Sequence, residues 1–303
     1  MQFYAHEGVI SQLFLSAVHM TRRGWALFLA LSVIWGVPYF MIRIAVRQLD
    51  PATLVFSRTV PAALILIPVA IHRRVLPSLR PVWRWVALYT VVEFGIPWLL
   101  MGSAERHLSS SLTGLIVASV PLVSVAIAKF LHPNVVIGTR RLLGLAIGTL
   151  GVATLVGLDI SGGSWMWVAA MLVVVAGYAS GPMILSLKLN DVSGLAVVSA
   201  SIAAVALVYL PWGATHWPTH LRPETWGSIG VLAFVCTAGG FLFLFASVKE
   251  NGPSRTVVVT YFNTAIAVAL GTAGLHEPLT AGLIIGFPMI VVGSIFATSR
   301  APD

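Results

Sequence analysis

The residues from His107 to Val156 decide the fold, and they read HLSSSLTGLIVASVPLVSVAIAKFLHPNVVIGTRRLLGLAIGTLGVATLV. A first apolar segment is broken by Pro121 and ends in a short polar turn. A second apolar segment follows and carries three closely spaced glycines, Gly144, Gly148 and Gly151. Two apolar segments of this length, joined by a turn, predict two consecutive helices that cross a membrane.

The same plan returns from Gly252 to Ala297, as GPSRTVVVTYFNTAIAVALGTAGLHEPLTAGLIIGFPMIVVGSIFA. At offsets of 143, 142 and 142 residues, the places of Pro121, Gly144 and Gly151 are taken by Thr264, Gly286 and Gly293. Earlier in each half, an offset of 141 residues relates Gly36, Arg47 and Asp50 to Gly177, Lys188 and Asp191. A period of half the chain indicates an internal repeat.

The amino-acid composition is typical of a membrane-embedded protein. The 303 residues are 58% hydrophobic and 9% charged, with a mean hydropathy of +0.93. Soluble domains carry about 25% charged residues, so a water-soluble globule would have too little charge to cover its surface. The single cysteine, Cys236, excludes a disulfide framework within the chain and a cysteine-rich metal site.

Ten apolar segments are long enough to cross a hydrocarbon core of ~30 Å as helices. We expect them at 24–46, 52–71, 83–101, 109–130, 139–157, 164–187, 193–213, 226–247, 254–275 and 280–299. Residues 1–23 form an N-terminal extension, disordered or interfacial, in which we predict no signal peptide. The natural start could lie at Met20.

The basic residues predict the orientation. With the N-terminus in the cytoplasm, 13 of the 18 lysines and arginines lie inside and three lie outside, namely Arg47, Arg106 and Arg222. The remaining two, Arg43 and Arg58, fall within spans. This bias follows the positive-inside rule and predicts that both termini are cytoplasmic. It also explains the net charge of +8 without nucleic acid as a partner.

Because each half has an odd number of spans, the second half has the opposite orientation in the membrane to the first. The halves run from 24 to 157 and from 164 to 299, with five spans apiece, so the second enters the membrane from the opposite side. Inverted repeats are typical of transporters that work by alternating access. The sequence therefore predicts an all-α membrane protein of two inverted five-helix repeats in the cell (inner) membrane. A duplicated membrane scaffold without transport is the competing interpretation.

The first half resembles the opening of EamA-type transporters of the drug/metabolite transporter superfamily. The matching residues are WGVPYFMIRIAVRQLDPATLVFSRTVPAALILIPVAI, which include Trp35, Gly36, Arg43, Pro51 and Arg58. The second half adds the Glu277-Pro278 turn with Gly286 and Gly293, and the resemblance covers residues 24–299. It implies ten helices around a central cavity lined mainly by spans one, three, four, six, eight and nine. It also implies export of amino acids, small metabolites or drugs.

Three residues depart from the family pattern and leave the substrate open. Asn134 stands where the first-half acid is usual, His276 replaces a glycine before Glu277, and Thr264 replaces the second proline. None of them alters the predicted fold.

Ionisable groups inside a bilayer indicate function by default. Glu93 lies deep in the third span, one turn before Pro97, and could carry a proton or face a cationic substrate. A neutral acid bonded to a neighbouring helix is the alternative. Arg58 lies about two turns inside span two and could neutralise a carboxylate or phosphate, or form an internal ion pair. A direct Glu93–Arg58 pair is disfavoured by their different depths, and Arg43 is expected to reach the interface.

Polar and aromatic residues of the spans complete the candidate substrate site: Trp35, Tyr39, Ser119, Tyr178, Tyr261 and Asn263. For Trp35, Tyr39 and Asn263, packing or bonding between helices is the alternative role. Four prolines within spans are candidate gate hinges: Pro38, Pro97, Pro121 and Pro182. The glycines of spans five and ten, including Gly282, are expected to pack the two halves together rather than to contact a ligand.

The sequence has no signature of an enzyme, a metal site or a nucleotide-binding cofactor site. We therefore predict a transporter of small, partly apolar metabolites such as amino acids or drug-like compounds, with export as the direction that the resemblance implies. Its partners would be the substrate, the lipid bilayer and possible coupling protons through Glu93. The alternatives are a proton-independent facilitator and a membrane-embedded enzyme acting on a lipid headgroup.

Overall fold

The computed structural model describes residues 20–131, 138–159, 164–252, 256 and 258–298, and the regular elements there are all helices. Asn134, Arg255, Arg300 and residues 1–19 of the predicted extension lie outside these described residues.

Seven helical segments in the described part of the chain are long and apolar enough to cross a membrane. Four are single helices: α2 (Arg22–Ala45), α3 (Pro51–His72), α9 (Trp165–Lys188) and α10 (Gly194–Thr215). Ser110–Leu131 consists of α6 (Ser110–Val117) and α7 (Val120–Leu131). Leu76–Ala104 consists of η1 (Leu76–Val82), α4 (Trp83–Tyr89), η2 (Thr90–Gly95) and α5 (Ile96–Ala104). Pro223–Asn251 consists of α11 (Pro223–Gly230), η3 (Val231–Gly239) and α12 (Gly240–Asn251).

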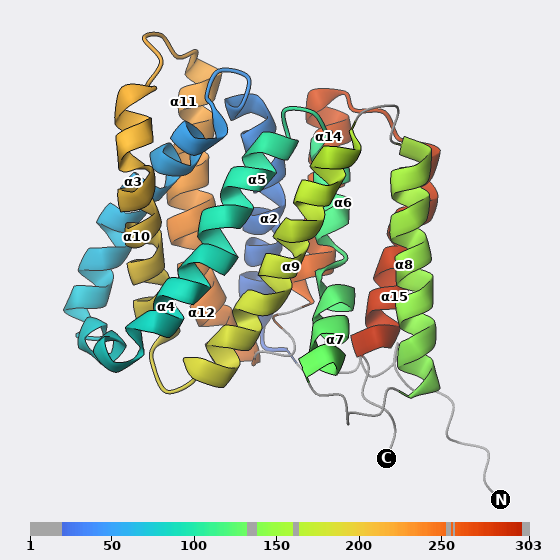
Figure 1. The fold of residues 1–303 in the computed structure, drawn as a ribbon, viewed down its shortest axis with the longest axis horizontal. Coiled ribbons are helices and arrows are strands. Elements are labelled where there is room, and N and C mark those ends of the chain that lie inside the picture. Colours follow the sequence, from blue (N-terminus) through green and yellow to red (C-terminus); the bar gives the residue numbers. More distant parts are fainter. Residues whose placement is uncertain (1–19, 132–137, 160–163, 253–255, 257, 299–303) are drawn as a thin grey trace, which may run out of the picture.

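Three further helices lie roughly along the same axis as these segments (Figure 1): α8 (Thr139–Asp159), α14 (Val259–Leu275) and α15 (Ala281–Thr298). The segments expected at 83–101 and 226–247 are both longer than predicted. The prolines at positions 77 and 223 look like loop signals in the sequence, but each lies in the first turn of a helix, where the missing N–H of proline is not needed.

Side-chain caps fix several helix starts. Thr21 accepts the Gly24 N–H at 2.9 Å at the start of α2, and Ser109 accepts the Leu112 N–H at 3.1 Å at the start of α6. Asp50 accepts the N–H groups of residues 52 and 53 at 3.0 Å before Pro51 begins α3. These caps satisfy backbone donors that a helix leaves free at its first turn.

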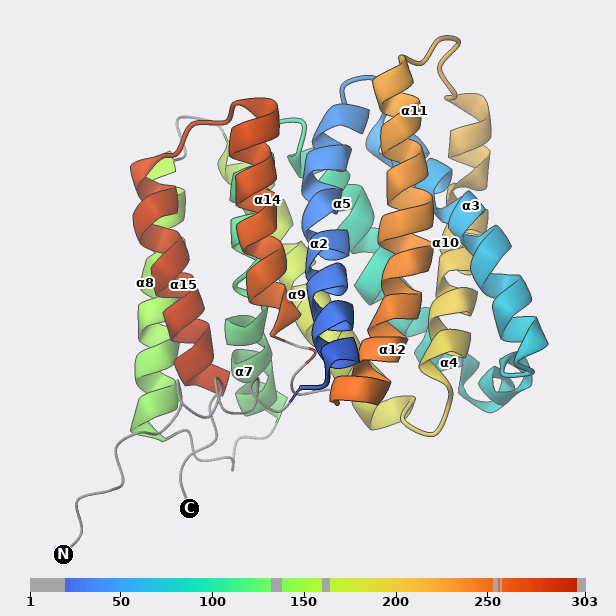
Figure 2. The same ribbon diagram turned by 180° about the vertical axis from the view of Figure 1, so that it is seen from behind.

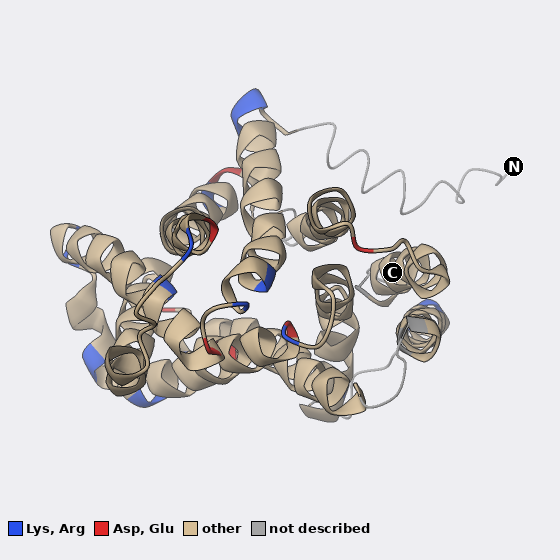
Figure 3. Ribbon diagram, turned by 90° about the horizontal axis from the view of Figure 1, so that it is seen from above, with Lys and Arg blue, Asp and Glu red and all other residues tan. Residues whose placement is uncertain are grey.

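The helices form a bundle in which α2 lies between α14 on one side and α11, η3 and α12 on the other (Figure 2). Helix α2 begins at the end of the bundle where α15 finishes (Figure 1). This end, called the basic end below, holds most described cations: Arg22, Arg23, Arg73, Arg74, Arg80, Arg84, Lys129, Arg140, Arg141, Lys188 and Lys249. Acidic and basic residues are sparse along the helices themselves (Figure 3).

The interior contains two large apolar clusters. One is built around α2, α6 and α9 and includes Leu115, Met171 and Leu155. The other is built around α3, α10 and α12 and includes Leu66 and Ile202. Large apolar side chains also lie exposed on the outside, as expected where lipid rather than water is the solvent; they include Leu64, Phe130, Leu207 and Val208.

Helices α8 and α15 make the most extensive helix–helix contact among the described elements. A Cβ added at Gly293 would lie 2.3 Å from the backbone nitrogen of Gly148, and one at Gly144 would lie 2.4 Å from that of Ala297. A Cβ at Gly151 would lie 2.9 Å from the carbonyl oxygen of Gly286. The predicted close packing of these two helices through their glycines is confirmed.

Two helical segments contain a wide π-helical stretch. These stretches, η2 and η3, interrupt the segments Leu76–Ala104 and Pro223–Asn251. The two halves of the sequence are offset by about 142 residues. Adding this offset to the bounds of η2, Thr90–Gly95, gives residues 232–237, which lie inside η3. The same irregularity therefore occupies equivalent places in the two halves, and π-helical turns are frequent at functional sites.

Replacing Gly293 with alanine should destabilise the protein by about 1–3 kcal/mol, because the new methyl group meets the α8 backbone, which cannot rotate away. Thermal unfolding in detergent measures the effect. Gly157→Ala in α8 is the matched control, since nothing lies within 4 Å of a Cβ there. An equal loss of stability in both variants would contradict the packing role.

His276 ends α14 in the left-handed conformation, with φ of 56°. This conformation explains why glycine suits the position that departs from the family pattern. His276→Gly should therefore stabilise the protein by about 1 kcal/mol, measured by thermal unfolding. His72→Gly, at the last helical residue of α3, should not stabilise it. A lower unfolding temperature for His276→Gly would show that the histidine side chain has a stabilising contact.

Candidate functional site

Arg58 is a buried cation at the centre of the candidate site. Its side chain leaves α3 and is 6% exposed. Its Nε and Nη2 atoms donate to the Thr237 hydroxyl at 3.3 and 3.0 Å, and its guanidinium carbon lies 3.8 Å from the centre of the Trp98 ring. Among the described residues, no carboxylate lies within ion-pair distance of it. Because a buried charge is costly without a counter-charge, Arg58 suits an anionic ligand.

Thr237 holds Arg58 through the π-helical stretch η3. The Thr237 side chain is fully buried, and its hydroxyl donates to the Leu232 carbonyl at 2.7 Å while accepting from Arg58. This hydroxyl therefore satisfies a backbone carbonyl of the π-helical stretch as a donor and the buried Arg58 side chain as an acceptor. Thr237 was not predicted from the sequence, because a threonine in an apolar span carries no charge to single it out.

A row of aromatic rings leads away from Arg58. Trp98 makes an edge contact with Phe94, with ring centres 5.2 Å apart, and Phe94 makes one with Phe241 at 5.5 Å. Phe241 in turn contacts Trp35 at 6.0 Å. The rings come from α5, η2, α12 and α2, so the row joins both halves of the chain. Trp35 also packs closely on Gly240, where an added Cβ would lie 2.6 Å from its Nε1 atom.

Glu93 lies in the other π-helical stretch, η2, and faces α9. A Cβ added at Gly181 would lie 1.8 Å from Glu93 Oε2, and one at Gly177 would lie 2.4 Å from the Val92 carbonyl oxygen. The small face of α9 thus leaves room for the carboxyl group and for the wide turn. Glu93 Oε2 is buried without a hydrogen-bond partner in the described structure. Glu93 and Arg58 form no ion pair there, as their depths predict.

Two buried tyrosines belong to the same region. Tyr178 packs against both large apolar clusters, interacts with the Trp98 side chain, and is electrostatically coupled to Glu93 and Arg58. Tyr39 is 5% exposed, packs on Gly114, and is coupled to Tyr178. The structure therefore brings Arg58, Glu93, Tyr178, Tyr39 and Trp35 into one region of the bundle.

The remaining candidates lie on other helices. Ser119 is buried at the break between α6 and α7, and its hydroxyl donates to the Ile116 carbonyl at 2.6 Å. Asn263 is 7% exposed on α14 and accepts from Thr264 at 3.3 Å. Its backbone faces Gly36 of α2. Tyr261 is half-buried on α14, two residues before Asn263. The two hydrogen bonds are local in the chain, only the approach of Asn263 to Gly36 packs two helices together, and none of these contacts involves Arg58.

The four candidate hinges divide into two kinds. Pro97 follows the π-helical stretch η2, and Pro121 follows the break between α6 and α7, so both stand beside an irregular turn. Pro38 and Pro182 lie inside the continuous helices α2 and α9. Hinge motion at any of the four remains a prediction.

Glu105 was not predicted as a site residue, although it is a buried acid. It follows α5 directly, is fully buried, and has no hydrogen-bond partner for either carboxylate oxygen in the described structure. Arg43 donates to the backbone carbonyl of Glu105. In the sequence, Glu105 precedes Arg106 in an apparent loop, and that context concealed its burial.

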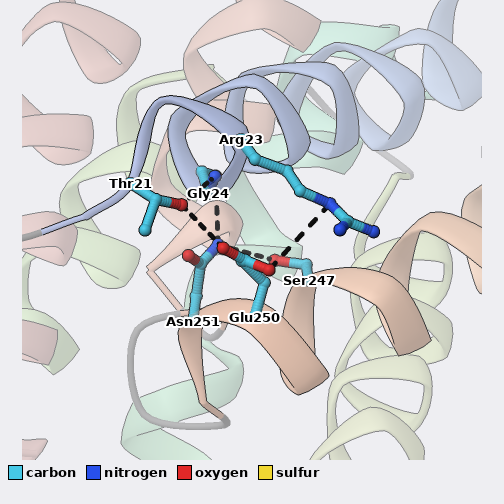
Figure 4. Close-up of polar contacts among 6 residues, drawn as sticks. All are labelled: Thr21, Arg23, Gly24, Ser247, Glu250 and Asn251. Carbon is cyan, nitrogen blue, oxygen red and sulfur yellow. Dashed lines mark hydrogen bonds and ion pairs between the residues drawn. The ribbon is translucent and has the colours of Figure 1, made fainter.

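Polar contacts tie the halves together at both ends of the bundle. At the basic end, Asn251 donates to the Gly24 carbonyl at 3.0 Å, and Glu250 accepts from the Thr21 hydroxyl at 2.7 Å (Figure 4). At the opposite end, the Glu277 carboxylate accepts the N–H and hydroxyl groups of Ser110 and Ser111 at 2.6–3.0 Å. Glu277 thus caps α6 from the loop before α15.

In the described part of the chain, long apolar helices enclose a buried arginine and two acids that have buried, unpartnered oxygens, which defines a multi-pass membrane protein with a few ionisable groups in an apolar interior. Residues 22–157 and again residues 165–299 match the EamA-like transporter family. The chain belongs to this family and is a membrane transporter.

Two relatives have a similar length. The chain is 29% identical over 293 residues to the uncharacterized inner membrane transporter YedA of Escherichia coli K12, covering 90% of this chain and 89% of that protein. It is 23% identical over 283 residues to the uncharacterized transporter YvbV of Bacillus subtilis 168, covering 91% and 92%. With its long apolar helices, the chain is a multi-pass protein of the inner membrane.

Two other proteins are similar to the chain. The protein PagO of Salmonella typhimurium is 28% identical over 301 residues, covering 91% of this chain and 96% of its own. A crystal structure superimposes with a TM-score of 0.64 over 91% of this chain and 96% of that one, at 17% identity. The likeness to the crystal structure extends to the fold alone.

Thr237→Val should destabilise the protein by about 1–3 kcal/mol, because the isosteric side chain leaves the Arg58 guanidinium and the Leu232 carbonyl without their shared hydroxyl. Thr237→Ser keeps the hydroxyl and is the matched control. Thermal unfolding in detergent measures both. If Thr237→Val is as stable as Thr237→Ser, then the hydroxyl does not hold Arg58.

Proposed function

We propose that this protein is an alternating-access exporter of small metabolites that carry an anionic group and an apolar part, such as amino acids or drug-like compounds. The single observation that carries this proposal is the buried Arg58, which has no carboxylate partner among the described residues and faces the ring of Trp98. The substrate's anionic group would complete an ion pair that the chain leaves open. Its apolar part would rest on the aromatic row from Trp98 to Trp35.

The proposed architecture has ten helices in two inverted repeats, 24–157 and 164–299, with both termini in the cytoplasm. Two family matches of similar length support a division of this kind. The opposite directions of α2 and α9, which begin the two halves, support the inversion (Figure 1). The concentration of cations at the basic end supports a cytoplasmic location for that end.

Alternating access would require the two ends of the bundle to open in turn. In the described conformation both ends are tied by contacts between the halves, through Asn251 and Glu250 at the basic end and Glu277 at the other. Each tie consists of a few hydrogen bonds near one end of the bundle, and opening that end would have to break them. The proposed central cavity would lie between them, around Arg58.

Two alternatives differ in their predictions. A proton-independent facilitator would use the same site without Glu93. An enzyme acting on lipid headgroups would need several catalytic groups that converge at one membrane interface, whereas Arg58, Glu93 and Tyr178 come together within the bundle. The transporter is therefore the better supported activity.

Cells that overproduce the protein should tolerate at least one member of a panel of toxic amino-acid analogues and metabolites. The compound found should then be taken up by proteoliposomes that contain the purified protein. Arg58→Gln should raise the KM by about 30-fold or more, because the loss of a buried charge contact costs at least ~2 kcal/mol. Arg47→Gln, on an exposed arginine, is the matched control. Unchanged kinetics in Arg58→Gln would reject the proposed anion site.

The same proteoliposomes test proton coupling. With an imposed pH gradient, the wild type should accumulate the compound, and Glu93→Gln should lose accumulation but keep exchange of labelled for unlabelled compound. Accumulation that ignores the pH gradient and is unchanged in Glu93→Gln would favour the facilitator.

A further inference from the structure

Glu105 is placed where an ionised carboxylate would be unstable. Its side chain is fully buried, and both of its oxygens lack a hydrogen-bond partner in the described structure. The nearest cation by contact, Arg43, directs a guanidinium N–H to the backbone carbonyl of Glu105 rather than to its carboxylate. A buried carboxylate without hydrogen bonds or a paired cation costs several kcal/mol, whereas a neutral carboxyl costs much less.

The other charged groups around Glu105 have their own partners. Arg58 is electrostatically coupled to Glu105 but donates to Thr237 and faces Trp98. Glu277 is coupled to it as well and is engaged with α6. Two arginines and one acid therefore influence Glu105 electrostatically, and none of them forms a hydrogen bond or ion pair with its carboxyl group in the described structure. This environment matches a carboxyl group that holds a proton.

We propose that Glu105 is a proton-binding site of this transporter, protonated in the described conformation and ionised when its end of the bundle opens to water. The proposal rests on the proposed transport function and adds a second proton-carrying residue to Glu93. In the step itself, the O–H bond of the carboxyl group breaks and the proton passes to a water molecule. The resulting carboxylate can then take a hydrogen bond from Arg43, whose side chain is already beside it.

The position of Glu105 connects it to the candidate substrate site. Tyr39 on α2 and Tyr178 on α9 are both electrostatically coupled to Glu105, and Tyr178 is also coupled to Glu93. The two acids lie at the start and the end of one stretch of chain, η2 followed by α5. Glu93 would thus take or give a proton beside the substrate, and Glu105 would exchange one with water at the end of the bundle opposite the basic end.

Infrared spectroscopy of the full chain in lipid vesicles detects protonated carboxyl groups directly and needs no substrate. Glutamate isotopically labelled at the side-chain carboxyl separates the glutamate bands from those of aspartate. At neutral pH, the wild type should show protonated glutamate, and Glu105→Gln should lose part of that band. Glu224→Gln is the control, since the Glu224 side chain is 55% exposed and pairs with Arg222 at 3.7 Å, so it should leave the band unchanged.

The proposal is overturned if the protonated band in Glu105→Gln equals that of the wild type. If Glu105→Gln fails to reconstitute, the wild type alone decides the question, because the absence of any protonated glutamate band at neutral pH contradicts the proposal. Glu93→Gln identifies the share of the band that belongs to Glu93, so the two residues are not confused.

Transport separates this proposal from the proposed function. If the wild type shows neither uptake nor exchange of the panel compound, the proposed function fails, while the infrared result on Glu105 still stands by itself. If exchange occurs, Glu105→Gln should keep exchange and lose accumulation driven by the pH gradient. Gradient-driven accumulation at the wild-type level in Glu105→Gln would overturn a role of Glu105 in coupling and leave the transporter assignment intact.

Discussion

A bilayer offers no water to a polar group, so each such group must find its partner inside the protein. In this chain, the partners of several polar side chains are supplied by distant helices. Arg58 reaches Thr237 across 179 residues, and Asn251 reaches Gly24 across 227. These bonds hold together helices that apolar packing alone aligns loosely, because lipid solvates apolar surfaces as well as a neighbouring helix does. Glu93 and Glu105 are the exceptions, with buried oxygens left unpaired in the described structure.

The region around Arg58 depends on local departures from regular helix geometry. The π-helical stretch η3 aims the Thr237 hydroxyl at both Leu232 and Arg58, and η2 places Glu93 against the glycine face of α9. In each case a small or polar residue on the neighbouring element accommodates the wide turn.

Much of the fold could be predicted from the sequence because membrane helices are recognisable as long, apolar segments. Gly144, Gly151, Gly286 and Gly293 predicted the α8–α15 contact correctly, since small residues at helical spacing have few other uses in an apolar span. Arg58 and Glu93 were equally visible, because each is a charge within an apolar stretch. The irregular segments η2 and η3 were not predicted, although the repeat offset relates one to the other.

Other features could not be predicted because they depend on tertiary contacts. Glu105 looks like a loop residue in sequence, and its burial appears only in the folded protein, where it directly follows α5 and its backbone carbonyl accepts from Arg43 of α2. Thr237 acquires its importance from Arg58, which is far away in the chain. The π-helical turns use residues that an ordinary helix accepts as well, so no residue type marks them.

The cap on α6 has a consequence for how the chain is made. The first turn of α6 depends on Glu277, which is synthesised 167 residues after Ser110. A ribosome must therefore complete nearly the whole protein before the N-terminal half receives the carboxylate that finishes one of its helices. During that interval the serine hydroxyls and amides of α6 stay open to other partners, such as water, lipid headgroups or a membrane chaperone. The molecule thus reaches its mature form late in biosynthesis, and a prematurely terminated chain would remain recognisably unfinished to quality control.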